Sequence, residues 1–298
     1  MDVVFIFNGL GNQMSQYAFY LQKKRYNENT IFILDKKSRN EHNGFELTTV
    51  FGIEYNDTLK KQILYYLFRF LEMQRFKLAM HPVKRLLKYL GFELHKEVEN
   101  YDFQQEYLDS PPSGSVRFLQ GGWHSEKYFI NIRHELSEVF NFKEDDDKKL
   151  KAYLCEIKNS ESVSIHLRRG DYISNEFNYN KYGSVCSLAY YTTAISEIKK
   201  LIPNPKFFVF SNDISWVKEN SIFKGMTVVD GFSGKESWKD MFLISRCKHN
   251  INSNSSFSWW SAWLNKNKNK NVIVPYYFIN QVETKDFYPE DWIKLVDY

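Results

Sequence analysis

The chain has 298 residues, of which 43% are hydrophobic and 17% aromatic. This composition excludes a disordered protein and is sufficient for two domain cores of ordinary size. The net charge of +4 is too small to indicate binding to nucleic acid.

The cysteines and the apolar segments define the expected compartment. Cys155, Cys186 and Cys247 are widely spaced and include no CxxC pair. We therefore expect a reducing compartment, no disulfide framework and no structural zinc. The apolar run at residues 3–7 is far shorter than the roughly 20 residues that span a bilayer. We expect no secretory signal, and a chain that is soluble or at most membrane-associated.

The first elements in chain order are a strand at residues 3–7 and a helix that follows Gly9-Leu10-Gly11-Asn12. Glycines at such a turn allow a ligand to approach the backbone, and the first helical N–H groups suit an anion. The alternative is a tight strand–helix turn with no ligand, because the full dinucleotide-binding pattern is absent. A second strand is expected at residues 31–34.

Residues 59–90 have a helical, amphipathic pattern that we expect to break at Pro82. The predicted apolar stripe consists of Ile63, Leu64, Leu67, Phe68 and Leu71. The segment is strongly basic, because Glu72 is the single acidic residue between residues 60 and 88. The basic residues in the same range are Lys60, Lys61, Arg69, Arg75, Lys77, Lys84, Arg85 and Lys88. Such helices can lie on an anionic membrane. The alternative is a solvated basic face over a packed core.

A further strand is expected at residues 116–120, followed by Gly121-Gly122-Trp123-His124. Trp123 and His124 at a strand end are candidates for lining a sugar site, although a buried core tryptophan is the more common outcome. The charged run at 143–149 is the best candidate for a domain boundary. We therefore predict domains at 1–150 and 151–298, the first with a basic helical insertion at 59–90.

The most informative stretch begins with alternating Val163, Ile165 and Leu167, which predict a half-buried strand. Arg168, Arg169, Gly170 and Asp171 follow it directly. In open α/β sheets, ligands bind at the carboxyl ends of strands. A guanidinium there offers a planar fork of donors that matches phosphate. The alternative is a surface turn with solvated arginines.

The second half continues to alternate between strands and helices. Helices are expected at 187–201, from Trp216, at 238–247 and in the later part of 253–264, and strands at 207–210, 226–229, 249–252 and 272–275. Asn212 and Asp213 follow one strand, and the serine-rich start of a helix follows another. Together with the arginines, these groups should lie at one sheet edge and suit a nucleoside diphosphate. A nucleotide-sugar transferase is the favoured enzyme class.

Four ordered motifs carry a resemblance to a known family. They are Gly9-Leu10-Gly11-Asn12-Gln13-Met14, the run His166 to Tyr172, Phe210-Ser211-Asn212-Asp213, and the run Asn252 to Trp260. The chain resembles the alpha-1,2-fucosyltransferases over nearly its whole length; Trp123 to Phe129 resembles a further signature, in which glutamine usually stands at His124. The resemblance implies an α/β fold of GT-B type, with two Rossmann-like domains facing a central cleft. It also implies transfer of L-fucose from GDP-fucose to the 2-hydroxyl of a terminal galactose, with inversion and without a metal or cofactor.

The resemblance also implies roles for individual residues. Arg168 would grip the β-phosphate and stabilise the departing GDP, and His166 and Asp240 would contact the guanosine. The remaining donor contacts would come from Gly11, Asn12, Asn212, Asp213, Ser255 and Ser256. Acceptor contacts are expected from Trp123, His124 and Glu176.

The base for the acceptor hydroxyl stays open between Asp171, Glu176, His124 and Asp213, with no essential base as a further alternative. Asp171 could equally orient Arg168 or Arg169 through a salt bridge. The expected partner is a galactose-terminated oligosaccharide or a lipid-linked glycan, handled in the cytoplasm or at the inner face of the cytoplasmic membrane. The alternatives are a fucosyltransferase of another linkage or acceptor, and a carbohydrate-binding protein without turnover.

Overall fold

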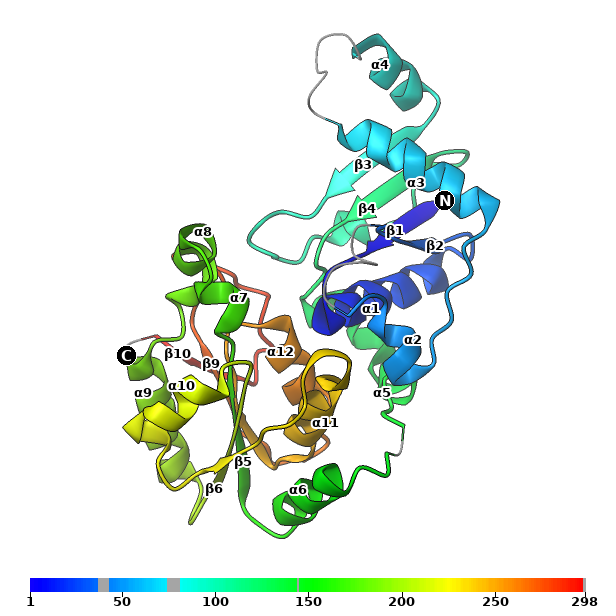
Figure 1. Ribbon diagram of the computed structural model, residues 1–298. Helices are drawn as coiled ribbons and strands as arrows, with labels where there is room; N and C mark the ends of the chain where they lie inside the picture. Colours follow the sequence, from blue (N-terminus) through cyan, green and yellow to red (C-terminus); the bar gives the residue numbers. More distant parts are fainter. Residues whose placement is uncertain (37–42, 74–80, 144, 297–298) are drawn as a thin grey trace. The chain divides into compact units, whose positions relative to one another are not determined.

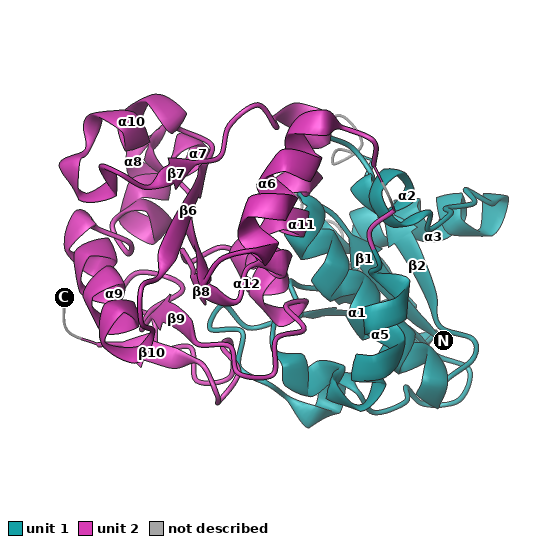
Figure 2. Cartoon of the chain, turned by 90° about the horizontal axis from the view of Figure 1, so that it is seen from below, with its two compact units in different colours: residues 1–141 teal, residues 142–298 magenta. Residues whose placement is uncertain are grey.

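The computed structural model describes residues 1–36, 43–73, 81–143 and 145–296. The chain forms two compact units, Met1–Asn141 and Phe142–Tyr298, and each unit has its own parallel sheet (Figure 2). The predicted boundary at 150/151 lies inside helix α6 (Lys148–Lys158). This helix belongs to the second unit because Leu150 and Ile157 are buried in that unit's core.

Unit 1 alternates strands and helices. Its elements are β1 (Asp2–Ile6), α1 (Leu10–Tyr26), β2 (Ile31–Leu34), α2 (Glu46–Phe51), α3 (Leu59–Glu72), α4 (His81–Tyr89), β3 (Phe92–Lys96), β4 (Val116–Gln120) and α5 (Arg133–Val139) (Figure 1). In the described part of the unit, the strand order is β2-β1-β4-β3 and all pairs are parallel.

The side chains of β1 point alternately to the two faces of the unit 1 sheet, and all of them are buried. Val3 and Phe5 of β1 point to one face and pack with Leu64 and Phe68 of α3. The rings of Phe5 and Phe68 stack at 3.7 Å between centroids. Helix α1 packs against β1 on the other face (Figure 1). Because successive side chains of a strand point to opposite faces, β1 contacts a helix on each side of the sheet.

The structure refines the predictions for residues 59–90 and adds a strand after them. The helical stretch is divided into α3 and α4 as predicted, but Pro82 lies in the first turn of α4 and not at the end of α3. Ile63 is 59% exposed, whereas Leu64, Tyr65 and Phe68 are the buried residues of α3. Strand β3 was not predicted. Of the predicted basic residues, Arg75, Lys77 and the side chain of Lys84 lie outside the described residues.

Unit 2 continues the alternation of strands and helices. After α6 its elements are β5 (Ser162–Leu167), α7 (Gly170–Ile173), α8 (Glu176–Asn178), α9 (Leu188–Leu201), β6 (Lys206–Ser211), α10 (Ile214–Glu219), β7 (Thr227–Val228), α11 (Trp238–Arg246), β8 (His249–Ile251), α12 (Ser256–Trp263), β9 (Val272–Pro275) and β10 (Ile293–Leu295). The described strands are parallel in the order β10-β9-β8-β5-β6-β7.

Strand β5 is central in this sheet and is buried along its whole length. Val163, Ile165 and Leu167 pack in one core with α9, while the second core, on the opposite face of β6, contains residues of α6 and α11. The prediction of a half-buried strand was therefore wrong, because helices cover both faces of a parallel sheet. The polar residues on the second face of β5, Ser164 and His166, are buried as well.

Candidate functional site

Three neighbouring strands of unit 2 end beside one another. Strand β5 pairs in parallel with β6 on one side and with β8 on the other. The loops that follow these strands begin with Arg168, Asn212 and Asn252. Because carboxyl ends of parallel strands share one sheet edge, the predicted residues of three sequence motifs are brought together there.

Arg168 presents part of its guanidinium to solvent. Its Nε lies 2.9 Å from Asp171 Oδ1, and its side chain is 29% exposed. The two Nη atoms make no hydrogen bond to the described residues. Asp171 therefore orients the guanidinium through its Nε edge and leaves the two outer nitrogens for a bound anion.

Arg169, in contrast, is fixed within the protein. Its Nε donates to Asp213 Oδ2 at 3.2 Å, and its Cζ lies 3.7 Å from the centroid of the Trp216 ring. Its backbone N–H donates to Asn212 Oδ1 at 3.0 Å. Gly170 is needed beside this contact, since a Cβ there would lie 2.5 Å from Asn212 Nδ2.

Asn212 and Asp213 consequently hold this loop in place. Besides Arg169, the Asp213 carboxylate accepts the backbone N–H of Trp216 at 3.2 Å and so caps α10. Both carboxylate oxygens of Asp213 are thus engaged by protein groups. Asn212 Oδ1 and the Asp213 carboxylate thus position Arg169, whereas the Asn212 Nδ2 makes no hydrogen bond to the described residues. Direct contacts of these two residues with the donor stay a prediction.

His166 is buried at the end of β5. Its Nδ1 lies within hydrogen-bond distance of the Ser253 hydroxyl, at 3.0 Å, and of the Ser258 hydroxyl. Burial, assisted by the charge of Arg168, lowers the pKa of His166 to about 3. Its Nε2 has no hydrogen-bond partner in the part of the chain that the structure describes. His166 is therefore a neutral imidazole with one ring nitrogen left for a ligand.

The serine-rich loop between β8 and α12 is held firmly. Ser255 caps α12 by accepting the N–H of Phe257 at 3.2 Å, and Ser256 is the first, half-buried residue of the helix. The Tyr172 hydroxyl donates to the carbonyl of Asn254 at 3.1 Å. The loop after β8 is thus linked to the loop after β5, and it presents hydroxyl groups at a helix start where anions are stabilised.

Asp240 lies in the first turn of α11. The residue is only partly buried, but its Oδ1 is enclosed and has no hydrogen-bond partner. Burial raises the pKa of this carboxyl well above its ordinary value. Since α11 leads back to the start of β8, its first turn lies toward the carboxyl edge of the sheet. A ligand that donates hydrogen bonds would satisfy this carboxyl group.

The four candidate bases differ clearly in their surroundings. Asp171 and Asp213 are paired with arginines. His124 is buried, and burial lowers its pKa to about 3. Glu176 in α8 is exposed, and within the described ranges it has no hydrogen-bond or ion-pair partner. Of the four, only Glu176 combines accessibility with an unpaired carboxylate.

The start of α1 in unit 1 differs from its prediction in one respect. Gly11 is buried and Asn12 is half-buried in the first turn, and the Asn12 side chain has no hydrogen bond to the described residues. The N–H of Leu10, however, donates to Glu46 Oε2 at 2.9 Å. A carboxylate of the protein therefore already occupies part of the predicted anion site.

Trp123 and His124 are core residues of unit 1. Trp123 is 0% exposed and stacks on Phe19 at 4.2 Å between centroids. His124 is also buried, with Nδ1 at 2.9 Å from the Ser15 hydroxyl. The prediction that these two residues contact the acceptor was wrong, because their rings are covered by the protein itself.

Sequence reasoning missed Glu97, which follows β3. Its Oε2 accepts the backbone N–H groups of Gly122 and Trp123 at 2.7 and 2.9 Å. Its Oε1 is enclosed without a hydrogen-bond partner. The alternation of Phe92 and Leu94 could have predicted a strand that ends just before this carboxyl. Glu97 holds the turn after β4, where Trp123 adopts a φ of 53° that is unusual for a non-glycine residue.

We expect Glu97→Gln to remove a pH dependence from stability. Burial raises the pKa of Glu97 from 4.5 to about 8. The neutral carboxyl therefore contributes stability that is complete below pH 4.5 and is lost as the pH rises to about 8. Gln keeps the acceptor oxygen and does not titrate. Thermal unfolding at pH 9 should give a melting temperature higher by about 4 °C or more than that of the parent chain.

The exposed Glu28→Gln serves as the control and should leave the unfolding curves unchanged at every pH. Parallel melting-temperature profiles for the parent chain and Glu97→Gln between pH 4 and 9 would contradict the assignment of a raised pKa.

The fold and the site define a class of protein. Two α/β units, each with its own parallel sheet, are the GT-B fold that solved fucosyltransferases share with this chain. The family model described as glycosyl transferase family 11 matches residues 2–296. The chain belongs to this family and is a glycosyltransferase.

Relatives and solved structures agree with this assignment. The chain is 31% identical to the alpha-1,2-colitosyltransferase of Escherichia coli, over 96% of both chains. It is 30% identical to the O-antigen biosynthesis glycosyltransferase WbnK of Escherichia coli, over 96% of this chain and 98% of that one. It is 26% identical to galactoside alpha-(1,2)-fucosyltransferase 2 of Rattus norvegicus, over 86% of this chain and 64% of the rat protein.

Two solved fucosyltransferases share the fold at low sequence identity. A variant of Arabidopsis thaliana FUT1 in complex with GDP aligns with a TM-score of 0.54 at 13% identity, over 97% of this chain and 74% of that one. NodZ from Bradyrhizobium aligns with a TM-score of 0.51 at 13% identity, over 87% and 91% of the two chains. At this identity the likeness concerns the fold alone.

Two kinds of feature are absent from the described residues. In the described ranges, no helix has both the length and the apolar character that crossing a membrane requires. Among the same residues, no group of three or more His, Cys, Asp or Glu side chains is arranged to hold a metal ion.

Proposed function

We propose that the chain transfers L-fucose from GDP-fucose to the 2-hydroxyl of a terminal galactose, with inversion and with no metal or cofactor. The observation that carries the proposal is the Arg168 guanidinium, which Asp171 orients at 2.9 Å while its outer nitrogens stay available. The name of the rat relative, a galactoside alpha-(1,2)-fucosyltransferase, supports the linkage and the acceptor.

Arg168 would act on the departing GDP. The bond between the sugar C1 and the β-phosphate oxygen breaks, so negative charge grows on the diphosphate while the ring gains positive character. A fixed cation beside the diphosphate stabilises this transition state more than the ground state. The galactose 2-hydroxyl oxygen attacks C1 from the opposite face and thereby inverts the anomeric centre.

The donor nucleotide would be held by the groups around Arg168. The enclosed oxygen of Asp240 and the free Nε2 of His166 suit the N–H and hydroxyl groups of guanosine. Ser255 and Ser256 at the start of α12 suit the diphosphate. Gly11 and Asn12 at the start of α1 stay predicted donor-binding residues.

In this proposal Glu176 accepts the proton of the attacking acceptor hydroxyl, and Asp171 orients the Arg168 guanidinium. Glu176 is the exposed and unpaired carboxylate among the four candidates, as described above. General-base assistance of this kind contributes about 10²–10⁴ in rate. Because the departure of GDP by itself gives the sugar ring most of its positive character, part of the rate would remain without the Glu176 carboxylate.

A colitose donor is the second candidate, because a relative at 31% identity is named an alpha-1,2-colitosyltransferase. Colitose is fucose without its 3-hydroxyl, so the same inverting chemistry at C1 applies. The two donors differ by one hydroxyl, which a site that hydrogen-bonds it can discriminate strongly.

The deciding experiment is incubation of the chain with GDP-fucose or GDP-colitose and lactose, followed by mass and linkage analysis. We expect a fucosyl-α-1,2-galactose product. A fucosylated product of another linkage would show a fucosyltransferase with a linkage other than α-1,2. A higher kcat/KM for GDP-colitose than for GDP-fucose would favour the second candidate. Glycan binding that GDP does not affect, without any product, would indicate a carbohydrate-binding protein.

We further propose that α4 brings unit 1 to an anionic membrane surface, in the cytoplasm, where a lipid-linked acceptor would reside. Val83, Leu86 and Leu90 lie at helical spacing on one face and are 45%, 54% and 54% exposed. Arg85 and Lys88 lie on the opposite face and are exposed. An exposed apolar face with basic residues opposite is typical of helices that lie in the membrane interface.

We expect the pair Arg85→Glu and Lys88→Glu to weaken binding to phosphatidylglycerol vesicles by about 30-fold, since each basic residue near such a surface contributes roughly 1 kcal/mol. Co-sedimentation measures the effect. The pair Lys266→Glu and Lys268→Glu, also exposed but in unit 2, is the matched control. Equal vesicle binding by both double variants would remove the proposal.

A further inference from the structure

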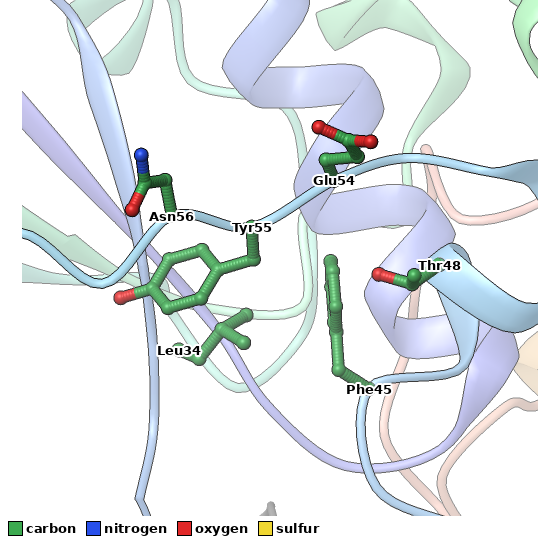
Figure 3. Close-up of a pocket in the computed structure, with 6 residues that line it drawn as sticks. All are labelled: Leu34, Phe45, Thr48, Glu54, Tyr55 and Asn56. Carbon is green, nitrogen blue, oxygen red and sulfur yellow. The ribbon is translucent and has the colours of Figure 1, made fainter.

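A cavity of about 460 Å³ in unit 1 has no part in the chemistry described above. It is lined by Leu34, Phe45, Thr48, Glu54, Tyr55 and Asn56 (Figure 3). Its volume lies within the range of about 300–1,000 Å³ that is typical of small-molecule sites. Leu34 is the last residue of β2, so the cavity lies at the carboxyl edge of a parallel sheet, where open α/β folds bind ligands.

Two aromatic side chains form a rigid part of the wall. The rings of Phe45 and Tyr55 are 6.2 Å apart between centroids, with an interplanar angle of 66°. Both rings pack on Phe32, at 6.3 and 5.5 Å. Lys61 further fixes Tyr55, with its Nζ 4.3 Å from the centre of that ring. Half-buried aromatic rings held in this way can pack on the C–H face of a sugar.

Polar groups complete the lining. The Glu54 carboxylate and the Asn56 amide are exposed and make no hydrogen bond to the described residues. Thr48 instead holds the wall together, because its hydroxyl donates to the carbonyl of Ile53 at 2.6 Å. A carboxylate that accepts and an amide that both donates and accepts match neighbouring sugar hydroxyls.

The charge on the lining decides between classes of ligand. Glu54 is the one charged residue among the six that line the cavity. A carboxylate repels a phosphate or another anion. An apolar ligand would make no hydrogen bond to this carboxylate or to the Asn56 amide. The occupant with matching chemistry is a neutral pyranose.

We infer that this cavity is a subsite for a neutral sugar of the acceptor oligosaccharide other than the galactose that reacts. The inference rests on the proposed function, because the subsite serves the acceptor of that reaction. Contacts with a second sugar explain how a glycosyltransferase can prefer an extended glycan to the simple galactoside at its end.

The test uses the double variant Glu54→Ala and Asn56→Ala, with Glu28→Ala and Asn29→Ala as the matched control. All four side chains are exposed and lie in unit 1. The KM for lacto-N-tetraose, a neutral tetrasaccharide that ends in galactose, should rise about tenfold in the double variant, since two hydrogen bonds are lost. The KM values for methyl β-galactoside, which has no second sugar, and for GDP-fucose should stay unchanged, and the control should match the parent chain in all three.

Saturation-transfer NMR with lacto-N-tetraose and no donor gives an independent measurement. In the parent chain the sugars other than the terminal galactose should receive magnetisation, and the double variant should lose these signals. An unchanged ratio of the two acceptor KM values together with unchanged NMR signals would overturn the inference and leave the transferase assignment intact. If no donor gives turnover, the proposed function fails, while the NMR comparison still decides whether the cavity binds the glycan.

Discussion

Arg168→Lys is expected to lower kcat by about 10²–10³, the effect of losing one preorganised donor to a developing anion. Lysine keeps the charge but loses the planar fork, so it cannot contact Asp171 through one edge and the diphosphate through the other. In the structure the Nε edge of Arg168 lies 2.9 Å from Asp171. Steady-state kinetics with GDP-fucose and lactose measure the loss, and the acceptor KM should change little.

The matched control is Arg25→Lys. Arg25 also pairs with a carboxylate, at 2.7 Å from Glu135, but on the exposed surface of unit 1. This variant should keep the parent activity, because an exposed ion pair contributes roughly 1 kcal/mol or less to stability. Near-parental turnover in Arg168→Lys would show that the guanidinium does not act on the leaving group.

Asp240→Asn should have two effects of opposite sign. The KM for GDP-fucose should rise by roughly tenfold, because asparagine keeps one acceptor oxygen but replaces the other with a donor, so one N–H of the guanosine is left without a partner at a cost of about 1–3 kcal/mol. The free protein, in contrast, should become more stable at neutral pH. Burial raises the pKa of Asp240, so the stability that its neutral form contributes is lost as the pH rises, and asparagine does not titrate.

Donor kinetics and thermal unfolding from acid to neutral pH measure the two effects together. The stability difference between Asp240→Asn and the parent chain should disappear at acid pH, where the carboxyl is neutral in the folded and the unfolded state. Asp291→Asn, an exposed aspartate of unit 2, should change neither quantity. A variant that lost donor affinity and stability in parallel would indicate a purely structural role for Asp240.

Local patterns in the chain predicted most of the strands and the position of the central loop. The strands at 31–34, 116–120 and 272–275 agree with β2, β4 and β9. Short apolar runs between turn residues are enough for such predictions, because backbone preferences act over a few residues. The ordered motifs likewise predicted the family, which the match over residues 2–296 confirms.

The roles of individual side chains depend on partners that lie far away in the chain. The sequence alone does not distinguish the roles of the neighbouring Arg168 and Arg169. In the structure, Trp216 and Asp213 contact Arg169 and fix it in place. Trp123 could have faced a sugar, but contact with Phe19 buries it. These outcomes follow from packing, which is a property of the folded chain and not of a local window.

The same reason explains the features that sequence reasoning missed. Burial is what makes Glu97 a group with a raised pKa, and it arises only when β3 lies beside β4. The cavity beside Leu34 needs Phe45 and Tyr55, which lie on separate segments and share a wall only after folding. The sequence thus determined most of the elements, the motifs and the family. The tertiary structure decided which of the conspicuous side chains are available to a ligand, because availability depends on contacts between distant segments.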